Sequence, residues 1–230
     1  MNVGVSKWSR GIAILTIVVI VPTLFMAPSS ASQRGLSDAS LAQFAEHYDD
    51  DALTRLSGWG AELRDAGGDE LTRARRANDF FNTLPWIDDN QLWGRRDYWA
   101  TPFEMLGING GDCEDYSIGK YFTLTHLSVP GEKLLITYVR APALRQTHMV
   151  LAYYPYPGAD PYILDNLIGE IRRGSERTDL YPVYSFNVDG IWKSDTTRRG
   201  RRVGGARRLN AWRAVLQRMQ SFGWRVPGFG

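Results

Sequence analysis

The stretch GGDCEDYSIGKYFTLTHL, residues 110–127, contains the only cysteine of this 230-residue chain, Cys113. Apolar side chains recur after the cysteine at helical spacing, which predicts a core helix that begins there. Asp112 stands directly before this helix, where aspartate is a favoured N-cap. The sequence therefore predicts that Cys113 is the first helical residue. The inward-facing residues of the helix would be Ile118, Tyr121, Phe122 and Leu124.

Three carboxylates, those of Asp112, Glu114 and Asp115, flank this cysteine in the sequence. The unpaired N–H groups and positive dipole end at a helix start favour a thiolate, whereas nearby anions oppose one. Rotation of about 100° per helical residue predicts that the carboxylates project away from the sulfur and gather together. Such a cluster suits calcium, which proteins hold with oxygen ligands. Alternatively, Asp112 only caps the helix while the other two acids offset the dipole in solvent.

The segments around the cysteine helix predict an α+β domain. Apolar residues at helical spacing predict helices from Leu36 to Asn82, with N-caps at Asp38 and Asp69, and the tryptophan-containing segment 84–105 is irregular. Residues rich in β-branched and aromatic side chains predict strands at 132–141, 147–154 and 161–166, a hairpin at 183–192 turned at Asp189-Gly190, and a last helix follows at 209–222. This order predicts a helical N-terminal part packed against an antiparallel sheet.

The first 31 residues have the features of a signal peptide. The opening MNVGVSKWSR carries two cations and no anion, and an apolar run follows from Gly11 to Ala27. Ser29 and Ala31 match a small-x-small cleavage site, so we expect an exported chain that begins at Ser32; an uncleaved anchor is the alternative. Loss of Lys7 and Arg10 lowers the formal net charge from +2 to zero. That balance argues against nucleic acid as a partner.

The expected exported chain, residues 32–230, reads as a single domain with three parts. Residues 32–105 form a mainly helical lobe, residues 106–192 a core with the sheet, and residues 193–230 a basic loop and the C-terminal helix. The basic loop contains RRGRRVGGARR, residues 198–208. A solvated loop is the expectation for such a run, and an acidic partner surface or anionic lipid is the alternative.

A lone thiol in an oxidising compartment either bridges two chains or is reactive, and a cysteine nucleophile needs a base and a group that orients it. Among the three histidines, His148 begins one predicted strand and Asp165 ends the next. Direct pairing of these two would centre the hairpin turn between Tyr156 and Pro157, inside the turn cluster YPYPGADP. The sequence therefore permits His148 and Asp165 to face each other.

Three motifs, GDCEDY at 111–116, THMVL at 147–151 and LDNL at 164–167, resemble in sequence and order those of the bacterial transglutaminase-like cysteine proteinases. The likeness runs from the helical part through LPWIDDNQLWG to about Trp192. It implies a papain-like, transglutaminase-like core with a catalytic triad of Cys113, His148 and Asp165. It also implies calcium bound by Asp112 and Glu114, with Asp115 as a third ligand.

Members of that family cut the N-terminal region of a large surface adhesin at a di-alanine site, which disperses biofilm. An inner-membrane receptor for cyclic di-GMP holds them inactive. The resemblance thus implies a calcium-dependent periplasmic cysteine endopeptidase. For such an enzyme we expect the Cys113 N–H to be one oxyanion donor, and Gln91 or Trp93 is a candidate second donor. Two alternatives remain open: a transglutaminase or amidase with the same triad, and a calcium-stabilised binding module whose thiol does no chemistry.

Overall fold

The computed structural model describes residues 1, 36–144, 146–193 and 200–226. Residues 2–35, which carry nearly all of the expected signal peptide, lie outside the described residues, as do residues 194–199 of the basic segment. Within the described chain, no helix combines the length and the apolar content that a membrane crossing requires.

Three capped helices form the N-terminal part. They are α1 (Asp38–Ala45), α2 (Asp50–Arg64) and α3 (Glu70–Phe81). Asp69 caps α3 as predicted, because its side chain accepts a hydrogen bond from the Thr72 N–H. The cap of α1 is Ser37 instead of Asp38, so that expectation was wrong by one residue. Asp38 lies in the first turn, where a negative charge also suits the dipole.

The segment 84–105, expected to be irregular, contains one short helix and the start of another. These are α4 (Asp89–Trp93) and α5 (Pro102–Ile108). A capping box formed by Thr101 and Glu104 starts α5 and explains why helix forms there. The cysteine helix α6 (Cys113–His126) follows and begins at the residue that the sequence predicts.

Within the described residues, seven strands form one antiparallel sheet in the order β4-β3-β2-β1-β5-β6-β7. Their bounds are β1 (Leu134–Ala141), β2 (Gln146–Tyr153), β3 (Tyr162–Leu164), β4 (Arg172–Arg173), β5 (Tyr181–Phe186), β6 (Ile191–Lys193) and β7 (Arg201–Gly204). Short 3₁₀ turns occur at Gly131–Lys133, Pro142–Leu144, Gly174–Glu176 and Ala206–Arg208, and α7 (Asn210–Ser221) ends the fold. The sequence did not predict β4 or β7, and β7 occupies part of the expected basic loop.

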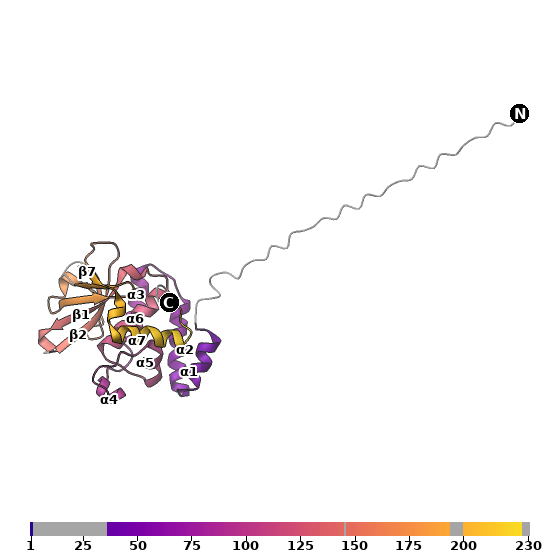
Figure 1. Cartoon of the computed structure of the whole chain (residues 1–230), viewed down its shortest axis with the longest axis horizontal. Helices are drawn as coiled ribbons and strands as arrows, with labels where there is room; N and C mark the ends of the chain where they lie inside the picture. The colour runs from indigo at the N-terminus through magenta and orange to yellow at the C-terminus, as the bar shows by residue number, and fades with distance from the viewer. Residues whose placement is uncertain (2–35, 145, 194–199, 227–230) are drawn as a thin grey trace.

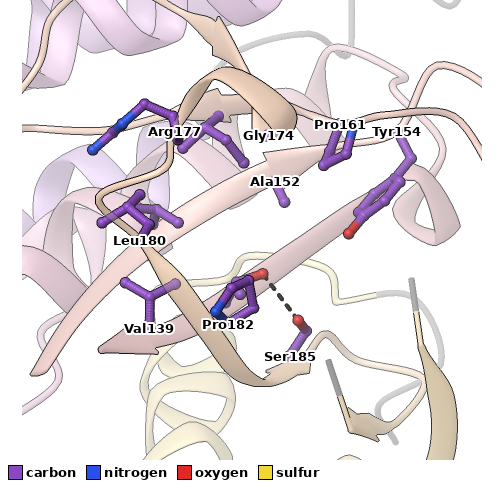
Figure 2. A pocket seen from close by; sticks show the side chains of 12 residues that line it. Val139, Ala152, Tyr154, Pro161, Gly174, Arg177, Leu180, Pro182 and Ser185 are labelled. Atoms are coloured by element: carbon purple, nitrogen blue, oxygen red, sulfur yellow. Dashed lines mark hydrogen bonds between the residues drawn. The ribbon is translucent and has the colours of Figure 1, made fainter. Parts of the chain in front are cut away.

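The helices cover one face of the sheet, which confirms the predicted α+β arrangement (Figure 1). The main core lies between these two layers and includes the inward side of α6. A smaller apolar cluster lies on the opposite face of the sheet. It borders a small pocket lined by residues that include Val139, Ala152 and Leu180 (Figure 2). The helix that carries Cys113 is therefore buried at the centre of the molecule.

Close packing between α3 and α6 depends on Gly119. A Cβ at this position would lie 2.3 Å from Cε1 of Phe81, a ring that is fully buried. One turn later, Thr123 Oγ1 accepts a 2.8 Å hydrogen bond from Nε1 of the buried Trp59. These contacts fix the position of α6 against the helical layer, and with it the position of Cys113.

We expect Gly119→Ala to lower the free energy of unfolding by about 1–3 kcal/mol, because Phe81 must move to admit the methyl group. Gly58→Ala, in the middle of α2, is the matched control. Its Cβ would meet only Phe80 at 3.6 Å, so the higher helix propensity of alanine should stabilise by up to about 1 kcal/mol. Urea unfolding of both variants measures the difference, and equal effects of the same sign would contradict this account.

Candidate active site

Cys113 lies in the wall of a cavity of about 760 Å³. The start of α6, the segment 86–99 and strands β1, β2 and β5 form this wall. His148 lines the same cavity. The other lining residues are Trp86, Asp88, Arg96, Asp97, Trp99, Asp112, Glu114, Tyr138, Thr147, Met149, Leu167 and Tyr184. A half-buried thiol and a buried imidazole thus share one cavity.

Asp115 fixes the start of α6 to the preceding segment. Its Oδ1 accepts a 2.6 Å hydrogen bond from the Ala100 N–H, and its Oδ2 accepts one of 3.1 Å from the Asp112 N–H. Gly111 lies so close that a Cβ there would be 2.6 Å from Asp115 Oδ2. Asp115, expected as a third calcium ligand, therefore already uses both oxygens to hold the backbone.

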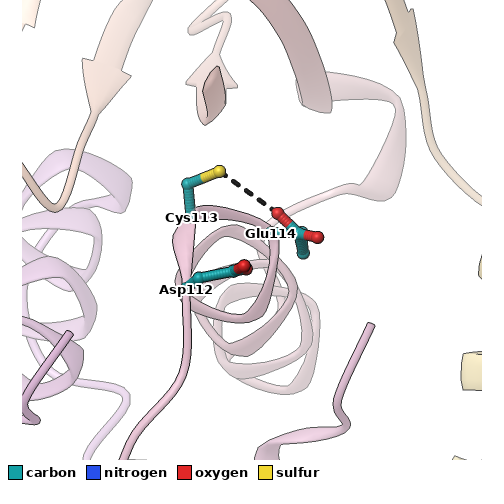
Figure 3. Close-up of side chains that lie close together, drawn as sticks. All are labelled: Asp112, Cys113 and Glu114. Carbon is teal, nitrogen blue, oxygen red and sulfur yellow. Dashed lines mark hydrogen bonds between the residues drawn. The ribbon is translucent and has the colours of Figure 1, made fainter. Parts of the chain in front are cut away.

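The Cys113 thiol donates a 3.1 Å hydrogen bond to Glu114 Oε2 (Figure 3). The prediction that all three carboxylates point away from the sulfur is therefore wrong for Glu114, whose long side chain reaches back despite its position on the helix. An Asp112 carboxylate oxygen also lies within 4.8 Å of the sulfur. Burial raises the pKa of the thiol well above its usual value, and the charges of Glu114 and Asp112 raise it further. A hydrogen bond with the Met149 backbone acts in the opposite direction.

Five carboxylates gather beside the thiol. Those of Asp89, Asp97, Asp112, Glu114 and Asp115 form overlapping groups of three whose closest atoms lie within 4.8 Å of one another. None of the five forms a salt bridge with a described lysine or arginine. Asp89 and Asp97 belong to the segment 84–99, which the sequence analysis did not connect with a metal. Only their spatial approach to α6 identifies them.

The electrostatics of this cluster fit a bound cation. Burial raises the pKa of Asp112, and the neighbouring Glu114 raises it further. Burial also raises the pKa of Glu114. Buried oxygens Asp112 Oδ1 and Asp89 Oδ1 have no hydrogen-bond partner among the described residues. Unpartnered buried oxygens at a site of crowded negative charge are what a hard divalent cation would satisfy.

His148 and Asp165 face each other across neighbouring strands. His148 lies in β2, Asp165 directly follows β3, and His148 Nε2 lies 2.8 Å from Asp165 Oδ1. Both side chains are almost completely buried. The Leu167 N–H also donates to Asp165 Oδ1, at 3.0 Å. The contact that the sequence permitted is therefore present.

The register of the two strands differs from the one that the sequence suggested. Leu151 pairs with Leu164, so the hairpin is centred between Pro157 and Gly158, one position later than expected. In this register the β2 residue directly opposite Asp165 would lie two positions along the strand from His148. Because side chains alternate between faces with a period of two, the shift leaves His148 and Asp165 on the same face, in a diagonal contact.

Arg177 completes this network, and the sequence analysis missed it. Its Nη2 lies 2.8 Å from Asp165 Oδ2 and 2.8 Å from Asp179 Oδ2, and the residue is 4% exposed. Nothing in the sequence distinguishes Arg177 from the many other arginines, apart from an aspartate two positions later. Burial alone would raise the pKa of Asp165, but a hydrogen bond and charge from His148, and hydrogen bonds from the Leu167 N–H and Arg177, lower it to about 2.

The expected second oxyanion donors do not reach the cavity. The segment contributes Trp86, Asp88, Arg96, Asp97 and Trp99 to the described lining, which includes neither Gln91 nor Trp93. Trp93 instead packs its ring 4.6 Å from that of Tyr98. Trp99 Nε1 donates to Asp97 Oδ1 at 2.9 Å. The Cys113 N–H, at the start of α6, remains the donor that the helix supplies.

The lowered pKa of Asp165 predicts a pH-dependent contribution to stability. A carboxylate whose pKa falls from 3.8 to about 2 on folding stabilises the fold above pH 4, and this contribution disappears as the pH falls to about 2. It amounts to about 2 kcal/mol. Asp165→Asn should therefore flatten the decline of unfolding free energy over this pH range. Exposed Asp51→Asn is the control, and parallel curves for wild type and Asp165→Asn would contradict the assignment.

Comparisons with known proteins agree with this geometry. The family model of the bacterial transglutaminase-like cysteine proteinases matches residues 44–185. A structure of LapG from Legionella pneumophila is 36% identical, covering 80% of this chain and 99% of that one, with a TM-score of 0.69. The same values hold for EGTA-treated LapG, with a TM-score of 0.70. Calcium-bound LapG is 37% identical over 78% of this chain and 97% of that one, with a TM-score of 0.68.

A search of curated protein sequences finds no match. The family match spans more than half of the chain, and the solved structures align with most of it over nearly their whole length. Both findings confirm the resemblance seen in the motifs around Cys113, His148 and Asp165, and the transglutaminase-like fold. The chain belongs to the bacterial transglutaminase-like cysteine proteinases of the LapG type.

Proposed function

We propose that this protein is a calcium-dependent periplasmic cysteine endopeptidase that cuts the N-terminal region of a large biofilm adhesin at an Ala-Ala site. We further propose that an inner-membrane cyclic di-GMP receptor regulates it. The observation that carries the endopeptidase assignment is the shared cavity, which Cys113 and the Asp165-bound His148 both line. The adhesin, the cleavage site and the receptor rest on the family resemblance.

In this mechanism His148 is the base and Asp165 orients it. Asp165 accepts the hydrogen bond at Nε2, so the neutral imidazole carries its proton there and Nδ1 is left as the proton acceptor. Nδ1 takes the Cys113 proton, and the thiolate attacks the scissile carbonyl. The imidazolium then protonates the leaving amine, and water resolves the acyl-enzyme. Arg177 keeps Asp165 ionised and fixed from its other oxygen.

The start of α6 stabilises both negative charges that the reaction creates. Its unpaired N–H groups and positive dipole end favour the thiolate, and the Cys113 N–H can donate to the developing oxyanion. The thiol in turn must leave Glu114, which accepts its hydrogen bond in this structure. Activation of the Cys113 thiol therefore depends on whether Glu114 has another partner to bind.

Asp112 and Glu114 are the residues that would hold calcium, with Asp115 as the third ligand that the family resemblance implies. Asp89 joins them because its carboxylate lies in one group with those of Asp112 and Asp115. A bound calcium ion would supply positive charge beside the thiol and offset the repulsion among the acids. The calcium-bound and EGTA-treated structures of Legionella LapG support this choice of ion.

We expect Cys113→Ala to abolish cleavage, with a loss of at least about 10³-fold in kcat, because no other described nucleophile replaces the thiolate. The substrate is the N-terminal region of the large adhesin from the same genome, and N-terminal sequencing of fragments locates the cut. Retained cleavage at Ala-Ala by this variant would contradict the proposal. Ammonia release from a glutamine peptide without a new N-terminus would favour the transglutaminase or amidase alternative.

Asp112→Asn, Glu114→Gln and Asp89→Asn should each weaken calcium binding at least about tenfold and lower cleavage in parallel. Isothermal titration with calcium and a cleavage assay measure the two effects on the same samples. Asp88→Asn is the matched control. Asp88 lines the cavity and caps α4, but it belongs to none of the carboxylate groups, and asparagine caps a helix equally well. Lost cleavage with unchanged calcium affinity would contradict the role given to the cluster.

A further inference from the structure

The charges of the chain are distributed very unequally along its length. Residues 196–230 contain nine arginines and no lysine, aspartate or glutamate. Residues 32–195 contain 16 basic and 25 acidic residues, a formal net charge of −9. Among the described arginines of the C-terminal part, Arg201, Arg202, Arg208 and Arg213 form no ion pair with a described carboxylate. No described carboxylate neutralises this positive charge.

Strand register brings part of this charge into line with the active-site cavity. Met149 pairs with Tyr138, Tyr138 with Tyr184, Tyr184 with Lys193, and Lys193 with Arg201. Directly paired residues of antiparallel strands point to the same face of a sheet. Met149, Tyr138 and Tyr184 line the cavity, so Lys193 and Arg201 continue its wall toward the β7 edge.

The two basic residues lie within reach of a substrate bound at Cys113. Neighbouring strands lie about 4.8 Å apart, so Lys193 is about 14 Å and Arg201 about 19 Å from Met149, whose backbone hydrogen-bonds the thiol. An extended peptide advances about 3.3 Å per residue. Side chains roughly four to six residues from the scissile bond would therefore meet Lys193 and Arg201, both of which are exposed.

The charge changes along this row of paired residues from Met149 to Arg201, and the change favours a ligand of one charge. The end of the row near the thiol lies beside the acidic cluster. Burial raises the pKa of Tyr184, and nearby negative charge, including that of Asp97 and Glu114, raises it further. Beyond Tyr184 the row becomes basic. A substrate that is neutral around the cut and acidic farther along complements this sequence of charges.

We propose that Lys193 and Arg201 form a basic subsite that binds acidic side chains of the protein substrate about four to six residues from the scissile bond. This rests on the proposed endopeptidase function, which it extends to substrate selection. An acidic peptide is the occupant because the row is continuous with the cavity that holds Cys113.

Paired peptides test the subsite. All are quenched fluorescent peptides with a central Ala-Ala bond. In each pair, one peptide carries glutamates four to six residues from this bond and the other carries glutamines at the same positions. One pair is made for each side of the bond. On one side, the glutamate peptide should have a kcat/KM roughly three- to tenfold higher at low ionic strength, and high salt should reduce this preference. The double variant Lys193→Glu/Arg201→Glu should reverse it. An unchanged preference in that variant, or equal cleavage of both peptides by wild type, overturns the proposal.

Arg202→Glu is the matched control. Arg202 is the neighbour of Arg201 in β7 but pairs with Trp192, which belongs to the apolar cluster on the opposite face of the sheet. Its guanidinium donates to the Asp189 carbonyl. This variant reverses one charge on β7, half the change that the double variant makes, and should keep the wild-type preference. Loss of the preference here would mean that general surface charge, not the subsite, attracts the peptide.

Binding separates this inference from the proposed activity. Cys113→Ala protein should bind a fluorescein-labelled glutamate peptide more tightly than the glutamine peptide, as measured by anisotropy, and the double charge reversal should remove the difference. If wild type cuts neither peptide while this difference persists, the Ala-Ala specificity is wrong and the subsite stands. Equal binding of both peptides, with sedimentation of the protein on phosphatidylglycerol vesicles that depends on Lys193 and Arg201, would replace the subsite with a membrane-binding surface.

Discussion

The burial of α6 between the helical layer and the sheet is the constraint on which the rest of the structure depends. Every residue from Glu114 to Leu124 is buried, and Gly119 lets the helix approach Phe81 more closely than any side chain would. Because a rigid helix transmits its position along its axis, packing at Gly119 and Thr123 determines where Cys113 lies two turns earlier. The thiol is placed by the core and not by a loop.

Two groups of buried carboxylates show how the fold manages charge in different ways. Asp165 has a histidine on one oxygen and an arginine on the other, and these partners hold its pKa at about 2. The cluster around Asp112 has no described basic partner, and burial raises its pKa values. In the first group, side chains of the same chain balance the negative charge of the carboxylate. The second is arranged so that a cation can compensate it.

Local pattern predicted the elements that carry the site, because helix and strand periodicity are local properties. The start of α6 at Cys113 and the facing of His148 and Asp165 follow from such patterns. Contacts between distant segments were not accessible in this way. The roles of Arg177 and Asp89 depend on contacts between segments that are distant in the sequence. The contact of Glu114 with the thiol depends on a side-chain conformation that backbone rotation does not fix. The register error of two residues preserved the His148–Asp165 contact only because its size was even.

The C-terminal region is part of the same folding unit as the site. Trp212 of α7 packs against Tyr121 and Phe122 of α6, and Trp224 stacks on Trp59 at 5.2 Å. Arg218 binds Glu104 at 3.0 Å. These aromatic contacts hold α7 and the segment after it on the core, and strand pairing holds β7 beside β6. Changes of exposed charge on β7 can therefore alter which peptides enter the cavity while Cys113, His148 and Asp165 stay where the core holds them.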